Sequence, residues 1–543
     1  MRLLKIETRN FRLLSSAELL LEEKVTVIVG RNNSGKTSLT ELFRRLLSDE
    51  PPSFRLEDFS LSAHEGFWNA LKAKLSGRAD EEIRKLLPVI EATLTIDYDK
   101  EATSLGVLGE CIIDLDANCH NAMLQTRYEL KVGQIPAFFA GLEPKDGKPE
   151  PEQRSDFIRA IRDRILKHYS CSLCAVDPGD PTNMKPLKWA TLRGVLASGF
   201  ITAQRGLDDV TSKDRDVLGK ILEALFKTAG SDSASQEDQH IARQLASSVE
   251  EVQTTIDASI NAQLKELIPA LEIFGYPGFA DPGLCTETTL DVQRLLTNHT
   301  KVHYAGINGV NLPEAYNGLG ARNLIYILLR LLEFYKEYLA EKTAPGAHIV
   351  FIEEPEVHLH PQMQEVFISH LSRVAALFSE KIGKGREWPV QFVVTTHSAH
   401  IANKAEFAAM RYFHVTGESA NSRSTGIKNL GTGLAGTPKE NLNFLHKYMT
   451  LTRCDLLFAD KAVLIEGISE RLMLPKMIEL LEVAEPTGPK LSTQYVSVVE
   501  IGGAFAHLFF PLVRFLDVPT LIITDIDTTK QETNAKGRKV NVA

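Results

Sequence analysis

Short, mostly apolar runs that end in polar or charged residues recur along this chain, and they predict buried strands of parallel sheets. Each run spans four or five residues, the length expected of a strand that is covered on both faces. Ligands of such sheets bind beyond the carboxyl ends of the strands, so the polar residues after each run are the first candidates for chemistry. The runs are Val25–Val29, Ile349–Ile352, Val390–Val394, Ala462–Ile465, Tyr495–Val499 and Thr520–Ile523.

A second set of strand-like segments predicts an antiparallel β lobe attached to the parallel sheet. Leu3–Phe11 alternates between apolar and polar residues, and Leu19–Leu21 can pair with it. Further segments of this kind are Val89–Tyr98, Cys111–Leu115 and Tyr128–Val132.

Helical periodicity dominates the stretch from Leu207 to Leu271. One apolar stripe runs from Val217 to Leu225 and another from Ile241 to Ile260, with a Ser-, Asp- and Gly-rich connector between them. The segment is acidic, which disfavours contact with DNA and favours packing between proteins. We therefore predict a helical hairpin that packs on a second copy of the chain, and the alternative is a purely intramolecular helical insert.

The first apolar run leads directly into a phosphate-loop pattern. Two glycines separated by four residues are followed by Lys36 and Thr37, and an apolar-striped helix comes next. The glycines let backbone amides point at phosphate oxygens, Lys36 supplies positive charge, and the Thr37 hydroxyl can ligate magnesium. The pattern predicts an ATP site made of Gly30, Asn32, Asn33, Ser34, Gly35, Lys36, Thr37 and Ser38.

Two adjacent carboxylates follow the second apolar run, and a histidine follows the third. We predict that Glu353 holds magnesium through water, that Glu354 activates a water as a base, and that His397 senses the γ-phosphate. The simpler alternatives are a capped strand–loop–helix junction for the two acids and a cap or core role for the histidine. A glycine turn before a helix, with Asn317, Gly318 and Gly320, is a candidate for a further phosphate contact, and the alternative is an ordinary turn.

The last three apolar runs deliver acids to one edge of a second predicted sheet. Four carboxylates gathered there are costly unless divalent ions neutralise them, and oxygen ligands suit Mg²⁺ or Mn²⁺. A metal pair at this edge can cleave a phosphodiester. The alternative is a set of strand-end acids that never meet. The predicted metal ligands and catalytic acids are Glu466, Glu470, Asp525 and Asp527.

Charge and composition limit the remaining possibilities. The net charge is −9, so any nucleic-acid contact must come from a local patch. Six cysteines in 543 residues are too sparse for a disulfide framework. The N-terminus alternates like a strand rather than a signal peptide, and no apolar run reaches membrane-spanning length. We expect a cytoplasmic protein.

The phosphate loop, the glycine turn, the double-acid strand and the strand-end histidine, in this order, resemble the ABC-type ATPases of the SMC and RecF kind. In that group two heads face each other, and the glycine turn of one head caps the γ-phosphate held by the other. The resemblance implies that role for Gly318, Leu319 and Gly320, although the family usually has serine where this chain has Asn317. The later pattern Leu-Ile-Glu-Gly, Gly-Gly and Asp-Ile-Asp resembles the Toprim domain.

An SMC-like ATPase followed by Toprim is the arrangement of the OLD (overcoming lysogenization defect) nuclease family, which includes GajA-type nucleases of anti-phage defence. The resemblance implies an α/β protein with four parts: ATPase domain 1–205 and 273–450, helical dimerisation insert 206–272, and Toprim domain 455–543. The Toprim part is expected to be incomplete, because sixteen residues follow Asp527 and the family continues further.

The same resemblance implies a homodimer or an assembly of dimers that cuts double-stranded DNA with ATP and Mg²⁺, with Mn²⁺ or another divalent ion possible at the Toprim site. A helicase-like accessory protein is a possible partner. The alternatives are a non-nucleolytic SMC- or RecF-like ATPase that acts as a DNA sensor or scaffold, and a RecF-like repair factor, for which Glu466, Asp525 and Asp527 are not needed.

Overall fold

The structure is a computed structural model of the chain. It describes residues 1–543 except 99–104, 115, 117, 144–148, 203–216, 273–288, 300–302, 306–310, 314–317, 342, 418, 420–421, 435–437, 439–440, 442–443, 446–447, 449–453, 489, 503–504, 526–529, 534–538 and 543. For residues 217–220, 264–272, 297–299, 303–305, 311–313, 530–533 and 539–542 it describes the backbone only. The predicted site residues Asn317 and Asp527 lie outside the described residues.

A six-stranded sheet forms the centre of the ATPase part, in the order β14-β13-β3-β12-β11-β8. The strands are parallel except β14, which runs antiparallel to β13. The first three predicted buried runs form three of its four inner strands, so Gly30, Glu353 and Thr396 come to one edge. The bounds are β3 Val25–Gly30, β8 Leu196–Ile201, β11 Ala347–Glu353, β12 Val390–Thr396, β13 Met410–Thr416 and β14 Ser424–Asn429.

The predicted antiparallel lobe is present as a second six-stranded sheet, ordered β2-β1-β4-β5-β6-β7. Its strands are β1 Arg2–Phe11, β2 Leu14–Leu20, β4 Ile90–Asp97, β5 Asn121–Leu130, β6 Tyr169–Val176 and β7 Met184–Pro186. The expected strand at Cys111–Leu115 is wrong over the described residues 111–114, which form a turn followed by a loop outside any strand. The run is apolar because Cys111 is buried in the lobe core and Ile112 packs against it.

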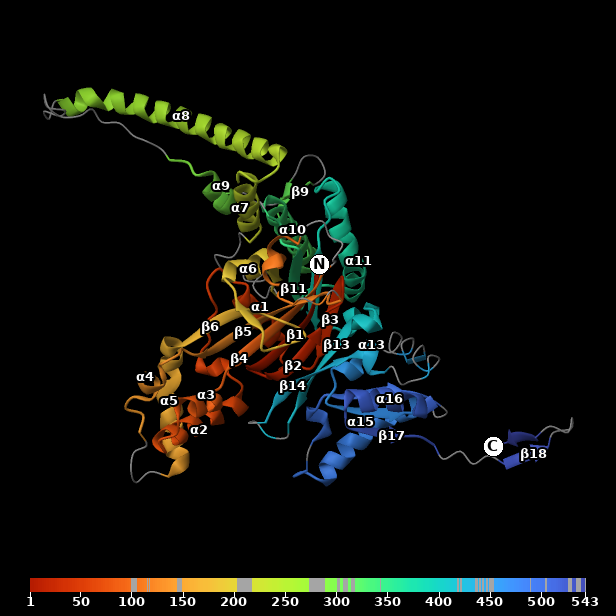
Figure 1. The fold of residues 1–543 in the computed structure, drawn as a ribbon. Helices are drawn as coiled ribbons and strands as arrows, with labels where there is room; N and C mark the ends of the chain where they lie inside the picture. Colours follow the sequence, from red (N-terminus) through yellow and green to blue (C-terminus); the bar gives the residue numbers. More distant parts are fainter. Residues whose placement is uncertain are drawn as a thin grey trace.

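Helix α1 (Lys36–Leu46) lies between the two sheets (Figure 1). Leu39, Leu42 and Phe43 are fully buried, and the Phe43 ring centroid lies 4.8 Å from that of Phe351 on β11. Burying such side chains contributes about 1.5–3 kcal/mol each, which fixes the helix, and therefore the phosphate loop before it, against the sheet edge.

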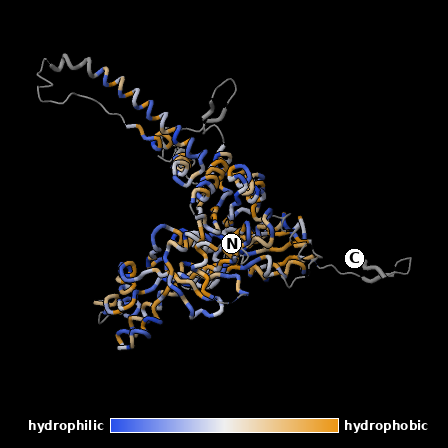
Figure 2. Tube along the Cα trace, turned by 45° about the horizontal axis from the view of Figure 1, so that its top comes forward, coloured by the Kyte–Doolittle hydropathy of each residue, from blue (hydrophilic) through white to orange (hydrophobic). Residues whose placement is uncertain are grey.

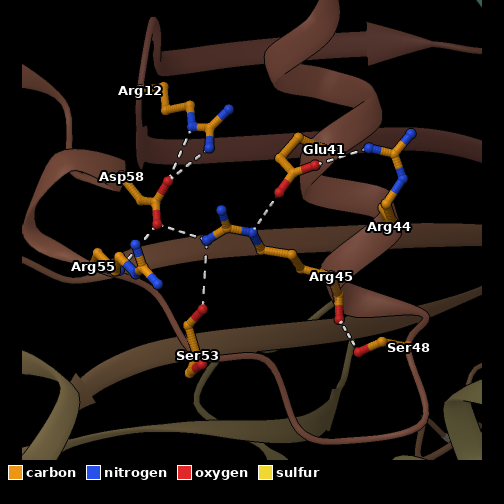
Figure 3. A network of polar contacts seen from close by, with 8 residues as sticks. All are labelled: Arg12, Glu41, Arg44, Arg45, Ser48, Ser53, Arg55 and Asp58. Carbon is orange, nitrogen blue, oxygen red and sulfur yellow. Dashed lines mark hydrogen bonds and ion pairs between the residues drawn. The ribbon is translucent and has the colours of Figure 1, made fainter. Parts of the chain in front are cut away.

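A buried carboxylate also ties α1 to the turn between β1 and β2 (Figure 3). Asp58 accepts hydrogen bonds from the guanidinium groups of Arg12 and Arg45 and from the backbone amide of Arg55. Burial alone would raise the pKa of Asp58, but these donors reverse the effect and lower it. Asp58 therefore stays ionised and crosslinks the lobe to the helix.

Helices α10 (Leu319–Ala340) and α11 (Pro361–Lys381) contribute to the core on the other face of the central sheet. The predicted helices of the insert are present as α7 (Val217–Ala229) and α8 (Gln236–Glu272), but they differ greatly in length, with 13 and 37 residues. Figure 1 shows α8 projecting away from the body. Its base is held by Lys336, whose Nζ lies 2.8 Å from the Asp238 carboxylate.

The predicted second sheet has β15 (Lys461–Ile465) between β16 (Val496–Glu500) and β17 (Thr520–Ile523), all parallel. Helices α15 (Ile468–Ala484) and α16 (Ala506–Leu516) belong to this part, which lies below the central sheet in Figure 1. Phe509, Leu512 and Leu516 of α16 belong to the same buried core as Val27 and Val350, so this part packs firmly on the ATPase part.

The remaining elements cover the lobe, connect the sheets or follow β17. No helix in the described part of the chain is long and apolar enough to cross a membrane. The bounds are α2 His64–Leu75, α3 Asp80–Leu86, α4 Ile135–Phe139, α5 Glu150–His168, α6 Trp189–Val195, α9 Val292–His299, β9 His303–Ala305, β10 Asn311–Pro313, α12 Ala399–Lys404, α13 Leu430–Gly433, β18 Lys530–Thr533 and β19 Lys539–Val542.

Candidate functional site

The phosphate loop between β3 and α1 has the tight backbone that its glycines predict. Gly30 and Gly35 have φ angles of 153° and 97°, and a Cβ at Gly30 would lie 2.2 Å from the carbonyl oxygen of Phe413. The Thr425 hydroxyl of β14 donates to the carbonyl of Ser34 at 2.8 Å. The loop is therefore held from one side by the neighbouring strands β13 and β14, and its glycines are required by space as well as by φ.

Lys36 is buried at the start of α1. Its ammonium donates to the carbonyls of Gly30 and Arg31, each at 2.8 Å. Burial lowers the pKa of Lys36 to about 8, and the negative charges of Glu354 and Glu356 oppose this shift. The group is thus a cation at neutral pH whose charge is lost more easily than that of an ordinary lysine.

Glu353 ends β11 beside the first turns of α1. Burial raises the pKa of its carboxyl, and the nearby Thr40 hydroxyl and Arg44 guanidinium oppose the shift. Its Oε1 atom is buried and has no hydrogen-bond partner among the described residues. Such an atom is costly unless something pairs with it, and a hydrated magnesium ion at the phosphate loop would fit.

Glu354 and His397 face each other across the ends of β11 and β12. The Glu354 Oε1 atom lies 3.6 Å from His397 Nε2, and both side chains are half-buried. Burial, together with the charge of Lys36, lowers the pKa of His397 to about 4. The imidazole is therefore neutral at physiological pH, and the two groups reach the edge where Lys36 lies.

Glu356 is a residue of this site that the sequence interpretation missed. Its carboxylate accepts a 2.7 Å hydrogen bond from the backbone amide of His397 and a 2.9 Å bond from the Thr396 hydroxyl. Burial raises the pKa of Glu356. It therefore positions the His397 segment and adds negative charge near Lys36. The sequence feature that could have indicated a role for Glu356 is its position two residues after the paired acids.

The glycine turn is attached to the segment that follows the paired acids. Gly318 precedes α10 and Gly320 lies in its first turn, where a Cβ would come within 2.7 Å of the His358 carbonyl oxygen. Asn323 Nδ2, one turn further, donates to the Val357 carbonyl at 2.8 Å. Gly318 is exposed and open to solvent, as a contact with a second head requires, but that role stays a prediction.

The second sheet brings two of the predicted metal ligands together. Glu466 follows β15, Asp525 follows β17, and the Asp525 amide donates to Glu466 Oε2 at 2.8 Å. Glu470 lies close in sequence, and its Oε2 accepts from the Gly467 amide at 2.8 Å, which caps α15. Within the described residues no three His, Cys, Asp or Glu side chains already form a metal-binding group, so the four-carboxylate site stays a prediction.

Comparisons with known proteins match both parts of this architecture. Residues 1–168 and 193–402 match the AAA ATPase domain family, and residues 457–527 match the Overcoming lysogenization defect protein-like TOPRIM domain. The chain belongs to the AAA ATPase domain family and carries an OLD-like Toprim domain. The predicted α/β architecture, an ATPase domain with a mixed sheet and an antiparallel β lobe followed by a Toprim domain, is thus confirmed.

Two curated relatives of this ATPase–Toprim chain span nearly all of it. Endonuclease GajA of Bacillus cereus (strain HuB5-5) is 25% identical over 540 residues, which are 96% of this chain and 73% of that protein. OLD nuclease of Thermus scotoductus (strain ATCC 700910 / SA-01) is 24% identical over 556 residues, with 99% and 86% covered. The SMC head domain from Thermotoga maritima aligns with a TM-score of 0.32 and 11% identity, over 79% of this chain and 99% of that one.

Proposed function

We propose that this chain is an ATP-hydrolysing, divalent-metal-dependent DNA endonuclease. The observation that carries the nuclease part of the proposal is the hydrogen bond from the backbone amide of Asp525 to the carboxylate of Glu466, at the carboxyl edge of the Toprim sheet. The endonuclease and nuclease names of the two relatives support the same activity. A role in anti-phage defence is the corresponding biological proposal.

The ATPase residues act mainly by binding and orienting phosphates. The backbone amides of the phosphate loop and the N-terminus of α1 hold the phosphate oxygens. Lys36 moves its ammonium from the loop carbonyls to the outer phosphates, where charge develops during transfer. Thr37 and Glu353 would hold magnesium, which when bound supplies neutralising charge between the phosphates.

Glu354 is the proposed base for the attacking water. Its carboxylate takes the proton as the oxygen of water attacks the γ-phosphorus and the bond to the β-phosphate oxygen breaks. The neutral His397 beside it contacts the γ-phosphate without competing with Lys36 as a second cation. Glu356 holds the His397 backbone, so that this segment does not shift during turnover.

The Toprim residues hold the cutting site together. Glu466, Glu470, Asp525 and Asp527 are the proposed ligands of Mg²⁺ or Mn²⁺, and a bound ion supplies water activation and stabilises the leaving oxygen. Glu466 also keeps β15 and β17 in register by accepting the Asp525 amide. Glu470 accepts the Gly467 amide through Oε2, and its Oε1 atom is the one proposed to join the ligands.

The long helix of the insert supports a proposal for how two copies assemble. Ile241, Leu245, Val252 and Ile260 recur along α8 and are 37–58% exposed, although a stripe of this kind is usually covered (Figure 2). We propose that a second copy covers it, and that the glycine turn with Gly318 and Gly320 completes the ATP site of the partner head. Double-stranded DNA is the proposed substrate.

The nuclease proposal is tested by plasmid cleavage with Mg²⁺ or Mn²⁺. We expect the protein to nick or linearise DNA and Asp525→Ala plus Asp527→Ala to abolish cutting. Glu479→Gln, on the exposed face of α15, is the control and should cut normally. Equal cutting by the double variant and the parent would refute the assignment, and absence of cutting by the parent would favour a non-nucleolytic sensor.

The ATPase proposal is tested separately with Glu354→Gln. Because the amide keeps the shape but cannot take a proton, ATP should still bind while turnover falls by about 10²-fold or more. Unchanged turnover would refute the role of Glu354. Lost binding would indicate that Glu354 serves binding rather than proton transfer.

A further inference from the structure

The phosphate loop touches the Toprim domain directly through Arg31. Arg31 is the second residue of the loop, between Gly30 and Asn32 in the sequence, and its guanidinium forms an ion pair with Asp460. Asp460 immediately precedes β15, and its backbone amide donates to the Tyr495 carbonyl just before β16 at 2.8 Å. The partner of Arg31 is therefore anchored at the starting ends of two Toprim strands.

A second connection runs through β14. Thr425 donates to the phosphate-loop carbonyl of Ser34, and three residues later Lys428 donates to the carbonyl of Phe515 at 2.6 Å. The Lys428 ammonium also lies 5.7 Å from the centroid of the Phe515 ring. Phe515 is in the last turn of α16, directly before the short turn into β17.

The first connection reaches the residue before β15, and the second reaches the last turn of α16, with four residues between Phe515 and the start of β17. β15 leads to Glu466 and β17 leads to Asp525, and these strands pair in parallel from Ala462–Thr520 to Ile465–Ile523. A strand is a stiff element, so a shift at its start is carried to its end. The Glu466–Asp525 contact is thus linked at both sides to one phosphate loop.

We propose that Arg31 is a positioning residue that couples nucleotide binding to the geometry of Glu466 and Asp525. Bound phosphates compete with Asp460 for the guanidinium, because phosphate and carboxylate accept the same forked hydrogen bonds. The movement of Lys36 to the phosphates also releases the Arg31 carbonyl that it holds. Asp460 then loses its partner and β15 moves relative to β17. This inference rests on the proposed roles of the two sites.

The test is hydrogen–deuterium exchange of the full chain, with and without Mg²⁺ and a non-hydrolysable ATP analogue. Peptides covering residues 461–467 and 520–525 report on the Toprim edge, and a fluorescent ATP analogue measures binding independently. We expect the analogue to change exchange in both peptides of the parent protein. Asp460→Asn leaves the phosphate loop intact and removes the competitor for Arg31, so it should lower the analogue Kd by up to about fivefold and reduce the exchange response about fivefold.

Lys428→Met tests the second connection without touching the ion pair. We expect it to weaken the response of the β17 peptide more than that of the β15 peptide. Glu479→Gln is the matched control, since it breaks a Toprim ion pair with Lys476 that does not reach the ATPase part.

The outcomes separate this proposal from the proposed function. An unchanged response in Asp460→Asn, or an equal loss in Glu479→Gln, overturns the coupling and leaves both active sites in place. A parent protein that binds the analogue with no exchange response overturns it as well. Failure of the parent to bind the analogue overturns the ATPase proposal and the coupling together.

Discussion

The charge of Lys36 should make ATP binding depend on pH in the mildly alkaline range. With its pKa lowered to about 8, the ammonium is about 90% protonated at pH 7 and about 10% at pH 9. Phosphate oxygens gain most from the charged form, so binding takes up a proton above pH 8. The Kd for ATP should rise about tenfold per pH unit there, which corresponds to about 1.4 kcal/mol of binding free energy.

A fluorescent ATP analogue titrated between pH 7 and pH 9.5 at constant ionic strength measures this dependence. Nucleotide phosphates keep nearly constant charge over that range, because the last pKa of a phosphate lies near 6. Lys36→Arg is the control, since a guanidinium does not titrate there and its Kd should be flat. A flat Kd for the parent, or an equal slope for Lys36→Arg, would refute the reasoning.

The same pH titration also tests whether the charge of Glu356 raises the pKa of Lys36. Glu356 carries negative charge that raises the pKa of Lys36, so Glu356→Gln should move the onset of weakening to lower pH. A shift to higher pH would show that Glu356 acts on nucleotide binding by another route.

Two further predictions concern the fold around the site. Gly30→Ala should abolish ATP binding and destabilise the protein by about 1–3 kcal/mol, because its Cβ would meet the Phe413 carbonyl. Urea unfolding measures the loss of stability. Gly179→Ala is the control and should be neutral, because its Cβ would meet only one side-chain oxygen, at 3.4 Å. His348 is buried, accepts a hydrogen bond from Trp388 Nε1 and has its pKa lowered to about 3. The unfolded chain takes up that proton near pH 6.5 and the fold does not, so His348 by itself should contribute about 2 kcal/mol to the fall in the free energy of unfolding between pH 6.5 and pH 5. His348→Gln should show a smaller fall, and an equal fall in this variant would contradict the assignment.

Local patterns by themselves determined the strands, the phosphate loop and the order of the two parts. A run such as Val25–Val29 is apolar because both faces of its strand are covered. The apolar run therefore predicts a buried strand even when the covering elements are not known. The acids after Ile352, Ile465 and Ile523 could be placed at sheet edges because parallel strands end together. The same reasoning failed at Cys111, where burial of a loop imitates a short strand.

The contacts between distant segments were decided by the tertiary structure. Glu356 became a partner of His397 because β11 and β12 are neighbours, and Arg31 met Asp460 because the Toprim sheet packs beneath the phosphate loop. Glu470 caps its own helix, and its position in the sequence alone could not distinguish this capping role from a role as a metal ligand. The Glu356–His397 and Arg31–Asp460 contacts join residues 41 and several hundred positions apart, and their distances are set by how the layers pack, whereas the sequence records local periodicity and residue chemistry.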